Sequence, residues 1–532
     1  MKRLLVTLLA LTLVFTLTAP SAMAASDDPI PLYGTGSSPD DPLFDPSLGL
    51  TLTVYQPTNW SEDSKPGNEA VKEWIEARTG LTLNWVYTAP DSYADKMNLV
   101  FVSGESYDAF SEGNILQTRS LQSLYDDGLI IDLSGYLDTY ATHFREYLND
   151  GFNYCQSTDG AILALPKRVS NHRGQTPTIR VDWLKQAGID GLPTTIEQWE
   201  TYMQYVLDHD VNGNGDPNDE IPLVPQNLRQ LQLCLMGIWL GEDGTATTNN
   251  YLGEDGVVYR NVNHPNYMAF LDKMREWYSK GYLYHEFFTT TTAQINDLVT
   301  ADRVGGACQW YSNIVRPFQT VEEADPEKSY SVMTNIQSPI EGVESIYTEG
   351  KTYTPVIMVS ATSEHPEVAI AYFDWLLSDP DINATVWLGF EGEQWEWADK
   401  DNFIFRTLPG ASDYYFKGFQ AVCQFDAEKQ FLYASPEDYV SIKYDEFLKQ
   451  LNDPSKQYAE AFDLMVPYTK IGTDLEFMNN DAETLLEEST ISYIIGNIDR
   501  DAMVAAIAEY NELYGNVYSE VYTQEYNDFI NR

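Results

Sequence analysis

The feature that most constrains this chain is a strand–helix–strand pattern at the start of its folded part. Leu50 to Tyr55 alternates apolar and polar residues, as a half-buried strand does. Residues 68–78 carry apolar side chains at helical spacing, and Gly80 follows as a stop. Residues 81–86 then alternate again. This βαβ unit implies a parallel sheet and an α/β architecture.

The same kind of pattern continues along the chain. A helix is expected over residues 93–101, and a short edge strand over 107–110. Further helices are expected over residues 180–187, 196–207, 267–279, 365–377 and 501–514. At about 100–200 residues per domain, 532 residues predict two to four folded units, and no short-period repeat indicates a solenoid.

The first 24 residues are typical of a secretory signal peptide. Lys2 and Arg3 precede an apolar stretch, which is too short for a comfortable membrane span, and Ala22-Met23-Ala24 gives a small-x-small cleavage pattern. We therefore expect residues 1–24 to be removed and the chain to be exported to an extracytoplasmic location. The first cysteine is Cys155, so no lipobox cysteine is present for lipid attachment.

Four cysteines in an exported chain permit up to two disulfides, in three connectivities, and buried free thiols are the alternative. They are Cys155, Cys234, Cys308 and Cys423.

The net charge of the chain bears on which partners it can bind. The chain has 80 Asp and Glu against 32 Lys and Arg, which gives −48. Such an acidic surface repels phosphate backbones, which argues against nucleic acid and anionic membranes.

The segment DVNGNGDPNDE, residues 210–220, alternates oxygen-bearing side chains and has glycine at its sixth position. Calcium binds about six to eight oxygens, and glycine permits the sharp turn that wraps them around one centre. The final acids, Asp219 and Glu220, stand earlier than the twelfth-position Glu of an EF-hand. We expect a shortened loop that holds a structural calcium ion; a surface turn that needs no ion is the alternative.

Catalytic motifs are not evident, so we expect no enzyme. The sequence has no G-x-x-x-x-G-K-[ST] phosphate loop, no G-x-S-x-G elbow and no H-E-x-x-H zinc helix. Tryptophans are more informative, because the flat apolar face of an indole suits the C–H faces of sugars. Three follow strands or lie in Gly-rich segments, and we predict that they contact a ligand: Trp60, Trp310 and Trp395.

Several segments together resemble one family. They are NEAVKEWIEARTG, YADKMNLVFVSGESYDAF, IRVDWLKQAGIDGLPTTIEQW, DVNGNGDPNDEIPL, YSKGYLYHEFF, SEHPEVAIAYFDWLLS and GFEGEQWEW, in that order. The chain resembles the extracellular solute-binding proteins of carbohydrate ABC importers, in particular the large oligosaccharide- and polysaccharide-uptake branch. The resemblance runs from about residue 50 to the C-terminus. Many members of that family are lipoproteins, and this chain departs from them in having no lipobox cysteine.

The resemblance implies a periplasmic-binding-protein-like fold with two α/β lobes, each a mostly parallel sheet flanked by helices, joined by a hinge. We expect a flexible linker over residues 25–50, and a solute-binding protein over residues 51–532. Its two interleaved lobes are expected over residues 51–167 plus 315–380, and 168–314 plus 381–532.

The resemblance also implies an oligosaccharide held between the lobes and delivered to the membrane subunits of an ABC permease. A monomer is the default for this architecture. The calcium ligands implied are Asp210, Asn212, Asn214, Asp216, Asp219 and Glu220. Arg173, Arg180 and Arg406 are available to neutralise a uronate if the sugar is acidic. The alternative functions are an exported carbohydrate-active hydrolase and a surface glycan-binding protein without a transport role.

Overall fold

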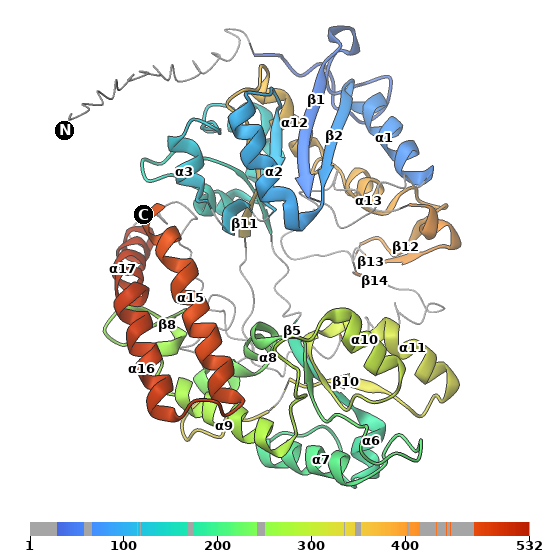
Figure 1. Cartoon of the computed structure of the whole chain (residues 1–532). Coiled ribbons are helices and arrows are strands. Elements are labelled where there is room, and N and C mark those ends of the chain that lie inside the picture. The colour runs from blue at the N-terminus through green and yellow to red at the C-terminus, as the bar shows by residue number, and fades with distance from the viewer. Residues whose placement is uncertain are drawn as a thin grey trace, which may run out of the picture.

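The chain folds into two α/β lobes, which Figure 1 shows one above the other. The computed structural model describes residues 29–57, 66–113, 115–117, 119–168, 175–241, 250–334, 336–345, 353–401, 404–414, 432–433, 443, 447 and 473–530. We call residues 29–168 and 353–414 the first lobe, and residues 175–345 and 473–530 the second lobe. Each lobe is built around its own hydrophobic core, which confirms the predicted two-lobed α/β class.

The first lobe contains a five-stranded sheet in the order β2-β1-β3-β11-β4. Its strands are β1 (Thr51–Pro57), β2 (Thr82–Thr88), β3 (Ala109–Ser111), β4 (Leu165–Arg168) and β11 (Tyr353–Val359). β1 runs parallel to β2 and β3, as the βαβ pattern predicts, but β11 is antiparallel to β3 and β4. The sheet is therefore mixed.

Helices cover the first-lobe sheet because they bury one apolar stripe each. They are α1 (Pro66–Thr79), α2 (Pro90–Ser103), α3 (Leu121–Asp126), α4 (Leu137–Tyr140), α5 (Thr142–Tyr147), α12 (Pro366–Trp375) and α13 (Pro380–Leu388). α1 buries Val71 and Ile75 completely, and it ends before Gly80, whose φ is +72°. A Cβ at Gly80 would lie 2.3 Å from the backbone oxygen of Phe44, so only glycine fits there.

The second lobe contains a four-stranded sheet in the order β10-β5-β9-β6. Its strands are β5 (Gln175–Arg180), β6 (Val224–Pro225), β9 (Ala307–Trp310) and β10 (Tyr330–Val332). Only β6 and β9 are parallel; β5 is antiparallel to both β9 and β10. The prediction of a mostly parallel sheet is wrong for this lobe. β5 begins at the end of the sheet where β9 ends, so these two neighbouring strands run in opposite directions.

Helices surround this second sheet: α6 (Val181–Gln186), α7 (Ile196–Asp208), α8 (Leu228–Leu240), α9 (Tyr267–Lys280), α10 (Thr292–Thr300) and α11 (Val315–Ala324). Three C-terminal helices stand along one side of the lobe: α15 (Thr473–Ile494), α16 (Arg500–Tyr510) and α17 (Asn516–Ile530) (Figure 1). A π-helical turn, Asn511–Gly515, joins α16 to α17. Small sheets are formed by β7 (Asn250–Leu252) with β8 (Val258–Arg260), and by β12 (Trp395–Asp399), β13 (Ile404–Thr407) and β14 (Leu432–Tyr433).

The division of the chain between the lobes differs from the expected one. Residues 315–332 contribute to a core of the second lobe, whereas α13 contacts α1, and Tyr414 packs in the first-lobe core. The described part of the expected linker, residues 29–50, is packed and not loose. Phe44 is fully buried, and Trp375 donates its indole N–H to the backbone oxygen of Gly36 at 3.2 Å. Residues 1–28, which include the predicted signal peptide, lie outside the described part.

Candidate functional site

In each lobe, one end of the sheet faces the other lobe. We call these two ends the first-lobe edge and the second-lobe edge. β4 ends at Arg168 in the first lobe, and β5 begins at Gln175 in the second, so the chain crosses between the lobes there. In the second lobe Gln175 pairs with Trp310, the last residue of β9. In the first lobe Tyr353, the first residue of β11, pairs with Arg168. Trp310 therefore lies on the second-lobe edge, and Tyr353 lies on the first-lobe edge.

Trp310 is the exposed aromatic residue on the second-lobe edge. Its side chain is 43% exposed, whereas Ala307 and Cys308 earlier in the same strand are fully buried. Its ring stacks beside that of Tyr311, with centroids 6.3 Å apart and an interplanar angle of 24°. An indole that keeps a free face at the end of a strand is suited to stacking on a ligand.

The first-lobe edge is polar. Glu112, directly after β3, donates its backbone N–H to Val356 of β11 at 2.9 Å. Its carboxylate accepts a hydrogen bond from the Thr354 hydroxyl at 3.3 Å and lies 3.9 Å from the Lys167 ammonium group. The ends of β3, β4 and β11 thus gather a carboxylate, a hydroxyl and an ammonium group at one place.

Of the other two tryptophans predicted to contact a ligand, Trp395 is described by the structure, and it does not lie on either edge. Trp60 lies outside the described residues. Trp395 is only 1% exposed, packs with Ala384 and Phe405, and donates its indole N–H to the backbone oxygen of Gly389 at 2.7 Å. An aromatic residue in a Gly-rich segment has the same local sequence whether it is exposed or packed inward, so the sequence could not separate the two cases.

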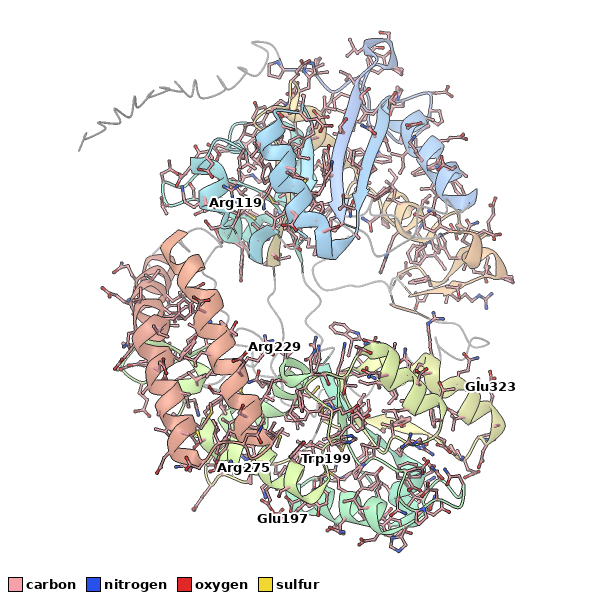
Figure 2. The ribbon with its side chains drawn as sticks, viewed as in Figure 1. Arg119, Glu197, Trp199, Arg229, Arg275 and Glu323 are labelled. Carbon is pink, nitrogen blue, oxygen red and sulfur yellow. The ribbon has the colours of Figure 1, made fainter. Side chains whose placement is uncertain are left out.

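A pocket of about 150 Å³ opens at the start of α8, and it escaped the sequence analysis. α8 follows the carboxyl end of β6 directly, and Asn227 caps it by accepting a hydrogen bond from the N–H of Gln230. Figure 2 shows Arg229, in the first turn of α8, on the side of the second lobe nearest the first lobe. The strand end followed by an Asn cap at residues 224–227 was the available signal, since ligands collect at such points in α/β folds.

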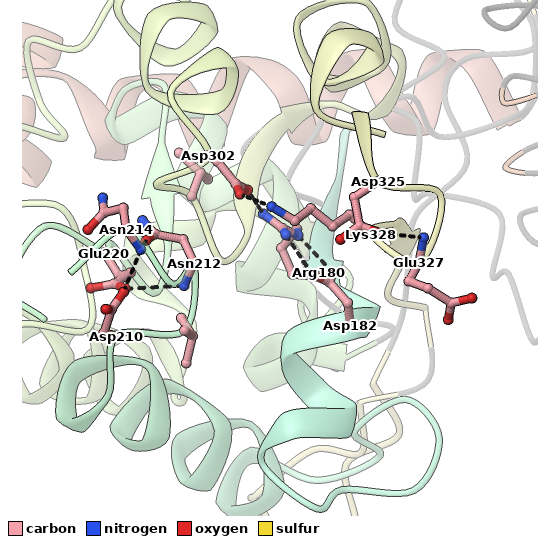
Figure 3. Close-up of polar contacts among 12 residues, drawn as sticks. Arg180, Asp182, Asp210, Asn212, Asn214, Glu220, Asp302, Asp325, Glu327 and Lys328 are labelled. Carbon is pink, nitrogen blue, oxygen red and sulfur yellow. Dashed lines mark hydrogen bonds and ion pairs between the residues drawn. The ribbon is translucent and has the colours of Figure 1, made fainter. Parts of the chain in front are cut away.

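The loop of residues 210–220 gathers its oxygen atoms inward. Asp210 accepts hydrogen bonds from the backbone N–H groups of Asn214 and Gly215 at 3.0 and 2.8 Å. Asp219 accepts from the side-chain amides of Asn212 and Asn214 at 3.3 and 3.0 Å. Figure 3 shows this cluster, in which the backbone N–H of Asn214 donates to Asp210 and the backbone N–H of Asn212 donates to Glu220.

Glu220 tests whether this loop suits a cation. The residue is 6% exposed, and its Oε2 atom is buried without a hydrogen-bond partner among the described residues. Burial raises the pKa of this carboxyl group. Oxygen is the donor type that calcium prefers, so the donor set fits the ion. Within the described residues, however, no group of three His, Cys, Asp or Glu side chains is close enough to hold a metal.

The second lobe holds the loop through Arg303, whose Nε donates to the backbone oxygen of Asp219 at 2.8 Å. The neighbouring residue, Asp302, belongs to a buried ion-pair network in which Arg180 also binds Asp182 with both carboxylate oxygens (Figure 3). Arg180 is fully buried, so the suggestion that it neutralises an acidic sugar is wrong. Arg406 is paired with Glu396, and Arg173 lies outside the described residues.

Three of the four cysteines lie in the described part of the chain, where they can be compared with the two alternatives of disulfides and buried free thiols. Cys155 and Cys234 are buried free thiols, and Cys308 is buried in β9. Burial raises the pKa of the Cys155 thiol, which makes it unreactive as a nucleophile. Cys423 lies outside the described residues. No helix in the described part of the chain has the length and hydropathy needed to cross a membrane.

Residues 69–390 match the family model described as bacterial extracellular solute-binding protein. Lipoprotein LipO of Bacillus subtilis (strain 168) is 22% identical over 481 residues, which are 88% of this chain and 90% of that protein.

Among the solved structures that share the fold, three come from two proteins. An HMO-binding, ABC-transporter-associated solute-binding protein of Bifidobacterium longum infantis has a TM-score of 0.70 at 18% identity, over 90% of this chain and 99% of that one. The ABC-transporter substrate-binding protein FusA of S. pneumoniae, in complex with kestose, has a TM-score of 0.68 at 16% identity, over 91% and 100%. An EF-hand mutant of FusA, in complex with fructo-nystose, has a TM-score of 0.66 at 17% identity, over 91% and 100%.

Proposed function

Because the chain belongs to the family of bacterial extracellular solute-binding proteins, we propose that it is the extracytoplasmic substrate-binding component of an ABC importer. Its ligand is an oligosaccharide, held between the two lobes. The single observation that carries the ligand class is Trp310, an exposed indole on the sheet edge that faces the first lobe. The kestose complex of FusA and the HMO-binding protein of Bifidobacterium support a sugar ligand.

The ligand is captured because it binds more tightly to the closed arrangement of the two lobes than to the open one. A sugar that contacts only one lobe gains little, whereas a sugar that contacts Trp310 and the polar edge around Glu112 favours the closed arrangement. Hinge closure of this kind requires the ligand to bridge both lobes. No covalent step is needed, which agrees with the absence of recognisable catalytic motifs in the sequence.

We propose that the loop of residues 210–220 binds a structural calcium ion. Asp210, Asn212, Asn214, Asp219 and Glu220 would supply side-chain oxygens, and Asp216 would add an oxygen of its own. The ion would neutralise the buried Glu220 carboxylate and fix the chain that leads directly into the bridge between Ile221 and Val304. The EF-hand mutant of FusA supports a calcium loop in this fold.

The remaining features of the proposal concern location and partners. The exported chain acts as a monomer outside the cytoplasm and delivers sugar to the membrane subunits of an ABC permease; it does not bind nucleic acid. Its relative LipO is a lipoprotein. This chain has no cysteine before Cys155.

A thermal-shift screen against neutral and acidic oligosaccharides, with calcium and with chelator, tests the proposal. A ligand at 100 times its dissociation constant adds about 2.7 kcal/mol to stability, which raises the melting temperature measurably. A rise with one glycan class, with the glycan recovered uncleaved, supports transport binding. Cleavage of the glycan would favour the hydrolase. Retention on insoluble glycan without binding of short oligosaccharides would favour the surface glycan-binding protein.

A further inference from the structure

A second hollow in the second lobe lies between the β7–β8 hairpin and the C-terminal helices, where β8 packs against α17 (Figure 1). Its volume is about 680 Å³, within the roughly 300–1,000 Å³ of small-molecule sites. We call it the hairpin pocket. Its walls come only from residues 251–266 and 511–519, so it belongs to the second lobe alone and does not include Trp310.

Two tyrosines form the aromatic part of this wall. Tyr251 and Tyr259 are paired directly across the hairpin, and their rings stack with centroids 5.5 Å apart and an interplanar angle of 28°. The Tyr259 hydroxyl donates to the Asp255 carboxylate at 2.8 Å. The Tyr251 hydroxyl donates to the backbone oxygen of Asn263 at 3.1 Å. Both rings are therefore held in place before a ligand arrives, which lowers the entropy cost of stacking on it.

Side-chain amides form the polar part of the wall. Asn263 and Asn511 pair reciprocally, because each donates one amide N–H to the oxygen of the other, at 3.0 and 2.6 Å. A primary amide has two N–H groups and two oxygen lone pairs, so each partner keeps one of each for a ligand. Asn511 can take this position because residue 515 is glycine: a Cβ at Gly515 would lie 2.3 Å from the Asn511 Oδ1 atom.

The π-helical turn brings a further amide to the hairpin pocket. The backbone N–H of Asn516 bonds to the oxygen of Asn511, five residues earlier. In an α-helix residue i+4 lies nearly above residue i, whereas a π-helical turn places residue i+5 there. Asn511 and Asn516 therefore both line the pocket, together with Ser519 one turn further along. Single π-helical turns inside α-helices occur frequently at functional sites.

The charges around the pocket limit its ligand. Among the described residues, no Lys or Arg lines it, whereas the exposed carboxylates of Glu254 and Asp255 do. His264 accepts the backbone N–H of Asn266 at its Nδ1 atom at 3.1 Å, so that nitrogen carries no proton. An anionic ligand would meet carboxylates and no cation, which excludes phosphates, uronates and acidic peptides. A ligand with apolar C–H faces, many hydroxyls and no charge suits the tyrosine rings and the amides, and this is the chemistry of a neutral sugar.

We propose that the hairpin pocket is a second sugar-binding site, which takes uncharged sugar units of a longer glycan. This inference goes beyond the proposed function, in which one oligosaccharide is held between the two lobes. Because a single lobe supplies every residue that lines the hairpin pocket, binding there does not depend on closure of the lobes. Exposed residues at its rim, among them Pro265 and Asn516, leave it open to solvent, so the rest of a long glycan can extend away from it.

Affinity electrophoresis tests this site. Native gels are cast with inulin, soluble starch or mixed-linkage β-glucan as neutral polysaccharides, and with polygalacturonate as an acidic one. At least one neutral polysaccharide should slow the wild type, and polygalacturonate should not. The dependence of mobility on polysaccharide concentration gives the dissociation constant. Trp310→Ala should still be slowed, because Trp310 lies outside the hairpin pocket, and this variant serves as the background in which the site is measured.

Variants of the pocket separate the ring from the amides. Tyr259→Ala removes a stacking ring and should raise the dissociation constant about tenfold, whereas Tyr259→Phe keeps the ring and should stay within about threefold of the wild type. Asn516→Ala removes an exposed amide and should weaken binding about threefold without lowering the melting temperature. The matched control is Asn98→Ala, which removes an exposed amide from α2 in the first lobe and should change neither quantity.

Three outcomes overturn the inference. If no neutral polysaccharide slows the wild type, the hairpin pocket holds water only. If Trp310→Ala abolishes the slowing while Tyr259→Ala and Asn516→Ala keep it, long glycans bind only between the lobes. If polygalacturonate slows the protein as much as a neutral polysaccharide does, the pocket does not select uncharged sugars. Failure of the proposed function gives a different result: no short oligosaccharide raises the melting temperature, while a neutral polysaccharide still slows Trp310→Ala.

Discussion

The effect of the substitution Glu220→Gln on stability should depend on whether calcium is present. In the calcium-free protein one carboxylate oxygen of Glu220 is buried without a partner, which costs about 1–3 kcal/mol. The amide of Gln removes the buried charge, so Glu220→Gln should melt at the same temperature as the wild type, or higher, in chelator. With calcium the charge is a ligand, and its loss should weaken ion binding.

The expected size follows from linkage. Calcium at 100 times its dissociation constant should add about 2.7 kcal/mol to the free energy of unfolding. At about 2–4 °C per kcal/mol for a unit the size of the second lobe, the wild type should melt roughly 5–11 °C higher with calcium than with chelator. In Glu220→Gln most of that rise should disappear, and titration calorimetry should show weaker calcium binding.

Differential scanning calorimetry with calcium and with chelator checks this expectation. The matched control is Glu254→Gln, which removes an exposed carboxylate in the same lobe and should keep the full calcium response. If Glu220→Gln melts lower in chelator and keeps the wild-type rise with calcium, the loop is an ordinary polar turn. The reasoning about its buried oxygen would then be refuted.

Three further predictions concern Trp310, Arg180 and His143. Trp310→Ala should weaken oligosaccharide binding by up to about tenfold in titration calorimetry without lowering the melting temperature, because an exposed indole contributes to the ligand and not to the core; Trp395→Phe should do the opposite, and equal effects would contradict this assignment. Arg180→Ala should cost about 3–5 kcal/mol in urea unfolding, because it leaves the partly buried Asp182 carboxylate without its cation and leaves Asp302 with Lys328 alone, whereas the more exposed Arg145→Ala should cost under about 1 kcal/mol. The Asp374 carboxylate raises the pKa of His143 chiefly through a hydrogen bond of 2.8 Å, so the stabilisation from this pair is fully present below the ordinary pKa of 6.5 and is lost as pH rises through the raised value. The melting temperature should therefore fall over that window, and His143→Gln should flatten the fall; identical pH profiles would exclude the pair as the cause.

The elements were largely predictable from the sequence because their signals are local. The strand–helix–strand unit of residues 50–86 appears as β1, α1 and β2, and the helices expected over 196–207 and 267–279 appear as α7 and α9. Alternation and helical spacing depend only on neighbouring residues. The helix expected over 501–514 was less accurate: regular α-helix ends at Tyr510, and a π-helical turn follows.

The candidate site was predictable only where one segment supplied it. Residues 210–220 carry their oxygen atoms in a single run, so the calcium hypothesis could be stated before the fold was known. The pocket at α8 combines Arg229, Tyr267 and Thr490 from three helices. No spacing in the sequence links residues that lie so far apart along the chain.

The sequence by itself determined the βαβ start, the positions of most helices, the acidic character and the oxygen-rich loop. The tertiary structure alone decided which tryptophan stays exposed: Trp310 ends a strand at a lobe edge, while Trp395 is covered by Phe405 and Ala384. It also decided that residues 315–332 belong to the second lobe and that residues 29–50 pack on the first. Burial depends on which distant segments meet, whereas secondary structure depends on a residue's neighbours, and only the latter can be read along the chain.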